Sequence, residues 1–169
     1  MTSRIGTFLF CAAVVLGLDQ ITKAVASARL MQGEPVPILG QFLRFTLVHN
    51  TGAAFGLFPG SRLPFILISV LAIAVVLYLF ARDAYRSLVN RVLLGCILGG
   101  ALGNLVDRVR WGRVVDFIDV GVGAVRWPVF NVADSAVTLG VILLVWNLVR
   151  SGRTDSDLES LPGSDFARG

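Results

Sequence analysis

Carboxylates in apolar surroundings are the residues of this sequence that could do chemistry. Asp116 has two apolar residues on each side, Asp134 has no basic residue within a helical turn, and Asp107 closes an apolar run. Two carboxylates that face each other in a medium of low dielectric cannot both ionise comfortably, so one of them keeps its proton. The charged one can activate water as a general base, while the protonated one donates to a carbonyl oxygen. Such a pair suits the hydrolysis of a peptide bond.

Other polar residues recur at helical spacing near these acids. Asp19 and Lys23 are four residues apart with the acid first, which places them on one helical face as a favourable pair. They could simply neutralise each other as a structural pair. An asparagine with polar residues at i+3 and i+4 occurs twice, from Asn104 and from Asn131. In the first copy, Asp107 and the arginine after it could form an ordinary ion pair at a membrane surface.

The sequence offers no other familiar catalytic set. His49 is the single histidine, and Cys11 and Cys96 stand far apart, so neither a zinc site nor a disulfide scaffold is expected. A Gly-x-Ser-x-Gly motif is absent. We therefore expect no metal and no cofactor. The basic residues are fourteen arginines and one lysine, scattered along the chain, so we expect membrane lipid as a partner and no nucleic acid.

The composition predicts a membrane around these residues. The chain is 55% apolar and 15% charged, with a mean hydropathy of +0.76, whereas soluble domains are about 45–50% apolar and 25% charged. A helix needs about 20 mostly apolar residues to cross a hydrocarbon core of about 30 Å. Four stretches meet this requirement, at residues 5–26, 62–82, 91–107 and 128–149. Four spans place both ends of the chain on one side of the membrane.

The first stretch admits a second interpretation. Arg4, the apolar run and the small residues at Ala24–Ala26 or Ala26–Ala28 also resemble a cleavable signal peptide. An acid and a lysine stand before both candidate cleavage sites, which argues against cleavage. Lysine and arginine residues in the connecting segments are tied at seven on each side, so charge alone does not orient the protein.

The segments between the spans differ in character. Within residues 27–61, Leu43, Phe45 and Leu47 alternate with more polar residues, which predicts a small sheet between spans 1 and 2. The small residues that follow Asn50 predict a tight loop. We expect loops at 83–90 and 108–127 and a disordered tail at 150–169. The fold class is therefore an all-α polytopic membrane protein, with four transmembrane helices and a small sheet, in a single membrane domain.

Five short blocks, taken in order, resemble the signature blocks of bacterial lipoprotein signal peptidase, or signal peptidase II. The blocks are Leu18–Lys23, Asn50–Phe55, Gly99–Arg108, Val114–Phe117 and Phe130–Ser135. Each block alone is weak, but their order and spacing on a four-span chain of this length are highly specific. The resemblance covers about residues 5–150. Val106, where the family often has an aromatic residue, is a mild departure.

The resemblance implies an aspartic endopeptidase of the bacterial inner membrane that keeps its first span. It implies cytoplasmic termini, an extracytoplasmic sheet and an active site toward the periplasmic or outer leaflet. It assigns the catalytic pair to Asp116 and Asp134. The supporting or substrate-contacting positions that it implies are Asp19, Lys23, Asn50, Gly52, Asn104, Asp107, Arg108, Asn131 and Ala133.

The implied substrate is a prolipoprotein whose cysteine carries a diacylglyceryl group, cut on the N-terminal side of that cysteine. The cyclic peptide globomycin is the implied inhibitor, and we expect a monomer. Two other classes of protein remain open. One is a small intramembrane ion or proton transporter or channel whose acids relay ions, and the other is a membrane adaptor without enzymatic activity. A transporter is expected to have inverted repeats or broken helices in paired positions, and neither is visible in the sequence.

Overall fold

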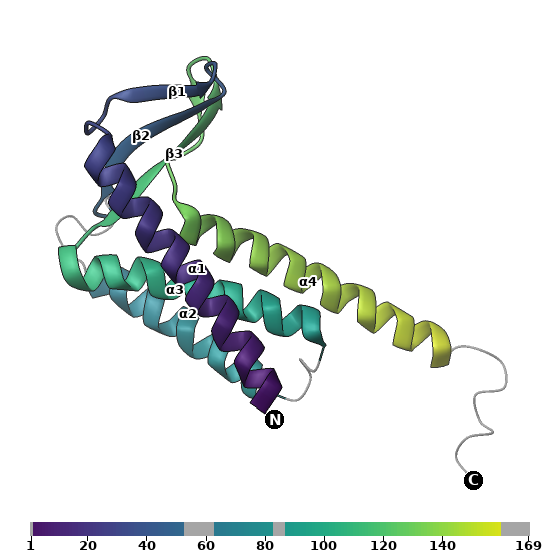
Figure 1. The fold of residues 1–169 in the computed structure, drawn as a ribbon. Coiled ribbons are helices and arrows are strands. Elements are labelled where there is room, and N and C mark those ends of the chain that lie inside the picture. The colour runs from purple at the N-terminus through teal and green to yellow at the C-terminus, as the bar shows by residue number, and fades with distance from the viewer. Residues whose placement is uncertain (1, 53–62, 83–86, 160–169) are drawn as a thin grey trace, which may run out of the picture.

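The computed structural model describes residues 2–52, 63–82 and 87–159, which form a helical bundle with a sheet at one end (Figure 1). The elements are α1 (Thr2–Arg29), β1 (Pro35–Leu39), β2 (Leu43–Asn50), α2 (Leu63–Ala81), α3 (Leu88–Trp111), β3 (Val114–Val122), β4 (Val125–Arg126) and α4 (Val132–Glu159). All four helices have a stretch that is long and apolar enough to cross a membrane, at Arg4–Arg29, Leu63–Ala81, Leu88–Trp111 and Val132–Arg150. The prediction of four spans is confirmed by length and composition.

Helix α3 lies at the centre of the bundle. Its most apolar stretch is 56% buried, whereas the corresponding stretches of the other helices are 11–17% buried. A Cβ atom at Gly95 or Gly99 would lie 2.5 Å from a backbone oxygen of α1, and one at Gly100 would lie 2.5 Å from a backbone oxygen of α4. Small residues allow this close approach, which matters in lipid because burying apolar surface between helices gains little there.

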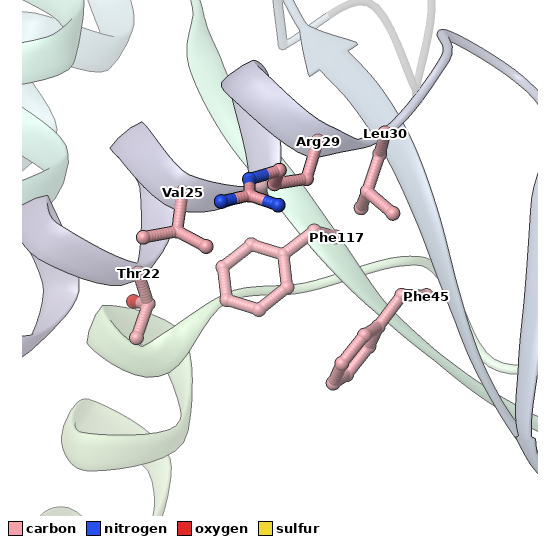
Figure 2. A pocket seen from close by; sticks show the side chains of 7 residues that line it. Thr22, Val25, Arg29, Leu30, Phe45 and Phe117 are labelled. Atoms are coloured by element: carbon pink, nitrogen blue, oxygen red, sulfur yellow. The ribbon is translucent and has the colours of Figure 1, made fainter.

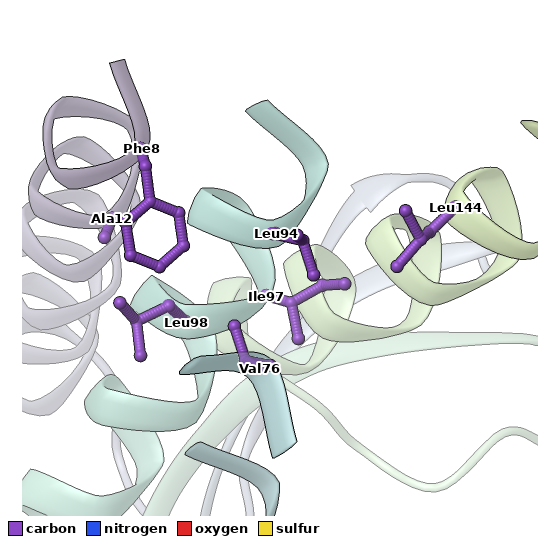
Figure 3. Packing of buried hydrophobic residues seen from close by; sticks show 7 residues of the cluster. All are labelled: Phe8, Ala12, Val76, Leu94, Ile97, Leu98 and Leu144. Atoms are coloured by element: carbon purple, nitrogen blue, oxygen red, sulfur yellow. The ribbon is translucent and has the colours of Figure 1, made fainter. Parts of the chain in front are cut away.

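Side chains from all four helices meet around α3 in one apolar cluster (Figure 3). Its members are Phe8, Ala12, Val76, Leu94, Ile97, Leu98 and Leu144. Phe8 also stacks on Phe80 of α2, with ring centroids 3.9 Å apart. Because Phe8 is in the first third of α1, this cluster packs the part of the bundle farther from the sheet.

The sheet has the strand order β1-β2-β3-β4, and all its pairs of neighbouring strands are antiparallel. The prediction that the sheet is formed by the segment between spans 1 and 2 is wrong in part. Strands β3 and β4 come from the 108–127 segment, which we expected to be a loop. Strand β3 is internal in the sheet, with four of its nine residues buried and only the last one exposed. Its first residues are therefore an apolar run around Asp116 without clear alternation, and periodicity alone cannot identify such a strand.

Helices α1 and α3 are longer than their predicted spans of 5–26 and 91–107. Helix α3 begins at Leu88 because Ser87 caps it: the hydroxyl of Ser87 accepts a hydrogen bond from the backbone N–H of Asn90 at 3.1 Å. The end of the expected 83–90 loop is therefore helical, whereas residues 83–86 lie outside the described part of the chain.

Helix α4 begins at Val132 and not at residue 128. The backbone of Phe130 exchanges two hydrogen bonds with Ile118 of β3, at 3.0 and 2.8 Å, so this segment is extended up to the helix. The helix then continues to Glu159. The expected disorder of the tail is therefore wrong for residues 150–159, and residues 160–169 lie outside the described chain.

A buried ion cluster holds the sheet together away from the helices. Asp119 of β3 accepts hydrogen bonds from Arg44 of β2 at 2.8 and 3.0 Å, from Thr46 at 3.0 Å and from Arg126 of β4 at 2.8 Å. Burial acts to raise the pKa of Asp119, but these hydrogen bonds and the charge of Arg126 outweigh it and hold the pKa below its ordinary value. The cluster joins three strands and fixes β3, the strand that carries Asp116.

Candidate active site

The polar residues predicted from the sequence converge where the sheet meets the first turn of α4. Asn131 is at the centre of this group, and its side chain has no exposed surface. Its Nδ2 donates to Asp116 Oδ1 at 2.7 Å, and its Oδ1 accepts from the backbone N–H of Asp134 at 2.9 Å. Asn131 therefore contacts both carboxylates that were assigned as a pair, Asp116 through its side-chain amide and Asp134 through its backbone N–H.

Asp116 is almost fully buried on β3. Its Oδ1 accepts from Asn131, and its Oδ2 accepts from Nδ2 of Asn50 at 2.9 Å. Burial raises the pKa of Asp116 to about 6; the negative charge of Asp134 acts in the same direction, and the two hydrogen bonds only partly offset this effect. Asp116 therefore holds a proton more readily than an ordinary aspartate does.

Asp134 is in the first turn of α4, three residues after Asn131. Its Oδ2 accepts from the backbone N–H of Asn131 at 3.3 Å while Asn131 caps the Asp134 N–H, so the two residues form a reciprocal capping box. Its Oδ1 accepts from Nδ2 of Asn104 at 2.7 Å. A carboxylate in the first turn of a helix faces the positive end of the helix dipole, which stabilises its negative charge.

A buried lysine lies behind these carboxylates. Lys23 donates to Asp19 Oδ2 at 2.8 Å, to Asp107 Oδ2 at 2.9 Å and to Asn104 Oδ1 at 3.0 Å. The three partners match the three donors of an ammonium group. Because Asn104 also binds Asp134, the lysine is joined to the proposed pair through one asparagine.

The two acids that pair with Lys23 also fix the backbone. Asp19 Oδ1 accepts from the N–H of Ala133 at 2.9 Å, which satisfies a free donor in the first turn of α4. Asp107 Oδ2 accepts from the N–H of Val115 at 3.2 Å, immediately before Asp116. Asp19 and Asp107 therefore do more than neutralise Lys23. Asp19 positions the segment that carries Asp134, and Asp107 positions the segment that carries Asp116.

Asn50 and Gly52 form the edge of the site on the sheet side. The Oδ1 of Asn50 accepts from the N–H of Gly52 at 2.8 Å, so Asn50 closes its own turn while its Nδ2 binds Asp116. Gly52 has φ of +82°, and a Cβ atom there would overlap the ring of Phe65. The predicted tight loop is therefore observed as far as Gly52, and its remainder lies outside the described residues.

Arg108 does not pair with Asp107. Residues adjacent along a helix do not face each other, and Nη1 of Arg108 instead donates to Oγ of Ser69 at 3.2 Å. Its guanidinium lies 6.0 Å from the centre of the Phe65 ring. Arg108 therefore lies on the α2 side of the site, whereas Asp107 belongs to the lysine cluster.

Two clefts reach the two carboxylates from different sides. A cleft of about 290 Å³ on the sheet side is lined by Val48, His49, Asn50, Thr51, Asp116, Pro128 and Val129. A cleft of about 180 Å³ among the helices is lined by Ile68, Ser69, Ala72, Ala101, Asn104, Asp134, Val137 and Thr138. The second cleft is mostly apolar, so a lipid-like group could lie beside Asp134.

Sequence reasoning missed two residues of this site. Nε2 of Gln20 donates to Asp107 Oδ1 at 3.0 Å, and Ser69 binds Arg108. Gln20 is within a signature block, and that was the available signal; Ser69 is inside the most apolar span, where nothing marks it. Within the described ranges, no group of three or more His, Cys, Asp or Glu residues could hold a metal ion.

The fold and the site together define a polytopic membrane enzyme. Two solved bacterial membrane enzyme structures obtained by the in meso method, at 2.3 and 1.9 Å resolution, share this fold with TM-scores of 0.78. The first is 36% identical and covers 88% of this chain and 90% of its own; the second is 38% identical and covers 85% and 93%.

The sequence comparisons identify the family. Residues 11–150 match the family model described as signal peptidase (SPase) II. Lipoprotein signal peptidases of Pelotomaculum thermopropionicum and Moorella thermoacetica are 44% and 43% identical, over 90% and 84% of this chain and 96% and 92% of their own lengths. That of Staphylococcus aureus is 36% identical over 92% of this chain and 95% of its own length. The chain belongs to the signal peptidase II family of peptidases.

Proposed function

We propose that this protein is a lipoprotein signal peptidase that cuts prolipoproteins on the N-terminal side of a diacylglyceryl-modified cysteine, with Asp116 and Asp134 as an aspartate dyad. The observation that carries the proposal is the bridge through Asn131, which donates from its side chain to the carboxylate of Asp116 on β3 and from its backbone N–H to the carboxylate of Asp134 on α4. Family membership supports the reaction, and the bridge supports the identity of the two acids.

The surroundings of the two carboxylates suggest different roles. Asp116 is buried and has its pKa raised to about 6, so it is the group that keeps a proton and donates to the scissile carbonyl oxygen. Asp134 is in the first turn of α4, where negative charge is stabilised, so it is the group that takes a proton from the attacking water. The resulting gem-diol collapses with proton transfer to the leaving amine, which needs no metal and no cofactor.

The clefts support a substrate that arrives from the membrane. The apolar cleft beside Asp134 opens among α2, α3 and α4 and suits the lipid or the signal segment of a prolipoprotein. Acyl chains gain little on moving from lipid into protein. Recognition therefore depends on polar groups near the dyad, and Arg108 and Asn50 are placed to donate to ester or backbone carbonyls.

We extend the proposal to the loop that begins at Asn50. Asn50→Ala and Gly52→Val should impair cleavage of the lipidated substrate and weaken the binding of globomycin, the proposed inhibitor. Inhibitor affinity and cleavage rate are measured on the same folded preparations. Wild-type values for both variants would show that this loop is only scaffolding.

The even number of spans places both termini on one side of the membrane, and membership of the signal peptidase II family supports the cytoplasmic side. Both termini are cytoplasmic, and the sheet and the dyad are on the periplasmic side of the bacterial inner membrane, where lipoproteins mature. The proposed working unit is a monomer, since among the described residues Asn50, Asn104 and Asn131 already supply donors to both carboxylates without a second copy. Cysteine labelling of single-cysteine variants at Arg4 and at Val122 in intact cells tests the topology, and labelling of Arg4 from outside would contradict it.

A cleavage assay tests the reaction. Purified protein in lipid is given a diacylglyceryl-modified prolipoprotein, and the cut site is read by mass spectrometry. Asp116→Asn and Asp134→Asn should each lower turnover by at least about 10³-fold, with little further loss in the double variant, since the two groups act as a unit. Asp119→Asn is the matched control on β3 and should retain cleavage. Near-normal cleavage by either single variant of the dyad would overturn the assignment.

A further inference from the structure

A third cleft lies at the sheet end of the bundle, and it shares one lining residue, His49, with the cleft that reaches Asp116. It has a volume of about 480 Å³, and the charged and aromatic side chains that line it are Lys23, His49, Asp107, Arg110, Trp111 and Arg113. Its walls are the last turns of α1, the end of α3, the start of β3 and the end of β2. Nothing in the proposed reaction uses this cleft.

The charges in this cleft are divided between its floor and its rim. On the floor, the ammonium of Lys23 is neutralised by Asp19 and Asp107. On the rim, Arg110 and Arg113 are exposed, and no carboxylate of the described chain lies within ion-pair distance of either. The rim therefore presents two guanidinium groups without an anion.

The excess positive charge at the rim of the cleft also acts on His49. Its ring Nδ1 lies 3.1 Å from Oε1 of Gln32. Burial lowers the pKa of His49, and the positive charge of Arg113 lowers it further. The other charged groups that line the cleft are Arg110 and the paired Lys23 and Asp107, so an anion bound at the rim would reverse the effect of Arg113.

The place of the cleft indicates which anion is available. Arg110 and Trp111 end the third membrane-spanning helix, and Trp111 is 68% exposed. Exposed tryptophan and arginine at the end of a span are typical of the headgroup layer. Arginine pairs with phosphate through two parallel hydrogen bonds, and lipid phosphates are the most abundant anions at that level.

We propose that this cleft binds the phosphodiester headgroup of an anionic phospholipid from the surrounding bilayer, held by Arg110 and Arg113 with Trp111 against the glycerol region. The lipid headgroup and inorganic phosphate both offer a charged phosphate group to the two arginines. The lipid is the proposed source because the cleft opens at the ends of two spans.

The chain provides a matched control on the other side of α1. There, a cleft of about 250 Å³ is lined by apolar groups such as Val25, Phe45 and Phe117, with Arg29 at its edge (Figure 2). Arg29 is also exposed and also ends a span, but it does not line the cleft with His49. Arg29→Gln therefore removes one positive charge from the same membrane level without touching the proposed site.

Because His49 is the single histidine of the sequence, its titration can be followed by NMR without overlap from other histidines. The full-length protein, labelled with ¹³C at histidine, is placed in a maltoside detergent, which carries no phosphate, and His49 is titrated by NMR. The titration is repeated with dihexanoyl phosphatidylglycerol, with dihexanoyl phosphatidylcholine and with inorganic phosphate. Phosphatidylglycerol should raise the midpoint by about one pH unit, since an opposite charge within about 4–6 Å favours the protonated ring.

The variants separate this site from a general effect of anionic detergent micelles. The rise should persist in Arg29→Gln and disappear in the Arg110→Gln/Arg113→Gln protein, whose exposed substitutions leave the core intact. An equal rise in the double variant, or no rise in the wild type, overturns the proposal. A response to inorganic phosphate without one to phosphatidylglycerol also overturns the lipid as the ligand.

Discussion

Asp116→Asn should make folding less sensitive to rising pH, although it removes a carboxylate from the proposed dyad. Burial raises the pKa of Asp116 from its ordinary value of 3.8 to about 6. Between these two values the folded state binds more protons than the unfolded state, so the free energy of unfolding falls as the pH rises. At about 1.4 kcal/mol for each pKa unit, the wild type loses roughly 3 kcal/mol across this window, and the variant does not.

The same substitution has a second effect that does not depend on pH. Asp116 accepts hydrogen bonds from Asn50 and from Asn131, one at each oxygen. An amide can replace only one of these acceptors, so one buried donor loses its partner at a cost of about 1–3 kcal/mol. The informative quantity is therefore how the difference in Tm between variant and wild type changes with pH, and not its sign at one pH.

Thermal unfolding in detergent between pH 4 and pH 8 measures this quantity. Relative to the wild type, the Tm of Asp116→Asn should rise by roughly 6–12 °C from pH 4 to pH 7 and then stay constant. Asp119→Asn is the matched control, because the pKa of Asp119 is held low. Its stabilising contribution is fully present above the ordinary pKa of 3.8 and is lost only as the pH falls below that value, so between pH 4 and pH 8 the Tm difference for this variant should stay nearly constant. A pH-independent difference for Asp116→Asn, or one that follows the Asp119→Asn curve, would refute the reasoning.

Substitutions at three further positions test the parts of the site separately. Asn131→Ser should keep a helix cap but lose the buried amide donor to Asp116, so it should be about 1–3 kcal/mol less stable than the wild type while turnover falls by about 10²-fold or more. Asn131→Ala also loses the cap and should be about 1 kcal/mol less stable than Asn131→Ser. Equal Tm values for the two variants would contradict the capping role. Lys23→Met should lower the free energy of unfolding by about 3–5 kcal/mol because two buried carboxylates lose their cation, whereas an unchanged Tm with no cleavage would indicate a lysine that contacts substrate. Gly52→Ala should slow cleavage because its side chain would overlap Phe65 at a positive φ, and normal cleavage by this variant would remove the turn from the site.

The sequence predicted the spans and the acids for simple physical reasons. A run of about 20 apolar residues has few other uses than crossing a bilayer, and an acid inside or beside such a run is costly unless it has partners. Asp19, Asp107 and Asp116 were recognisable on this ground alone. In the structure each of these three acids is buried and has hydrogen-bonding partners, as the cost of an unpartnered acid in such surroundings requires.

The sequence could not predict the contacts that connect those acids. Asn104 and Asp134 are 30 positions apart, and Gln20 and Asp107 are 87 positions apart. Such pairs meet only because α3 packs closely against both α1 and α4, and no local pattern encodes that packing. Strand β3 was missed for a related reason: its burial comes from neighbours distant in sequence, which removed the alternation that marked β2.

The hydrogen bond from Ala133 to Asp19 joins residues 114 positions apart, and this separation sets an order of events during biosynthesis. The first span leaves the ribosome long before α4 exists, so in that interval Asp19 and Lys23 have only each other to offset their charges in the bilayer. Asp107 arrives with the third span, and Asn131 and Asp134 arrive with the last. A nascent chain therefore carries a neutralised ion pair but only one acid of the proposed dyad, so if Asp116 and Asp134 act together, proteolysis begins only when insertion into the membrane is finished.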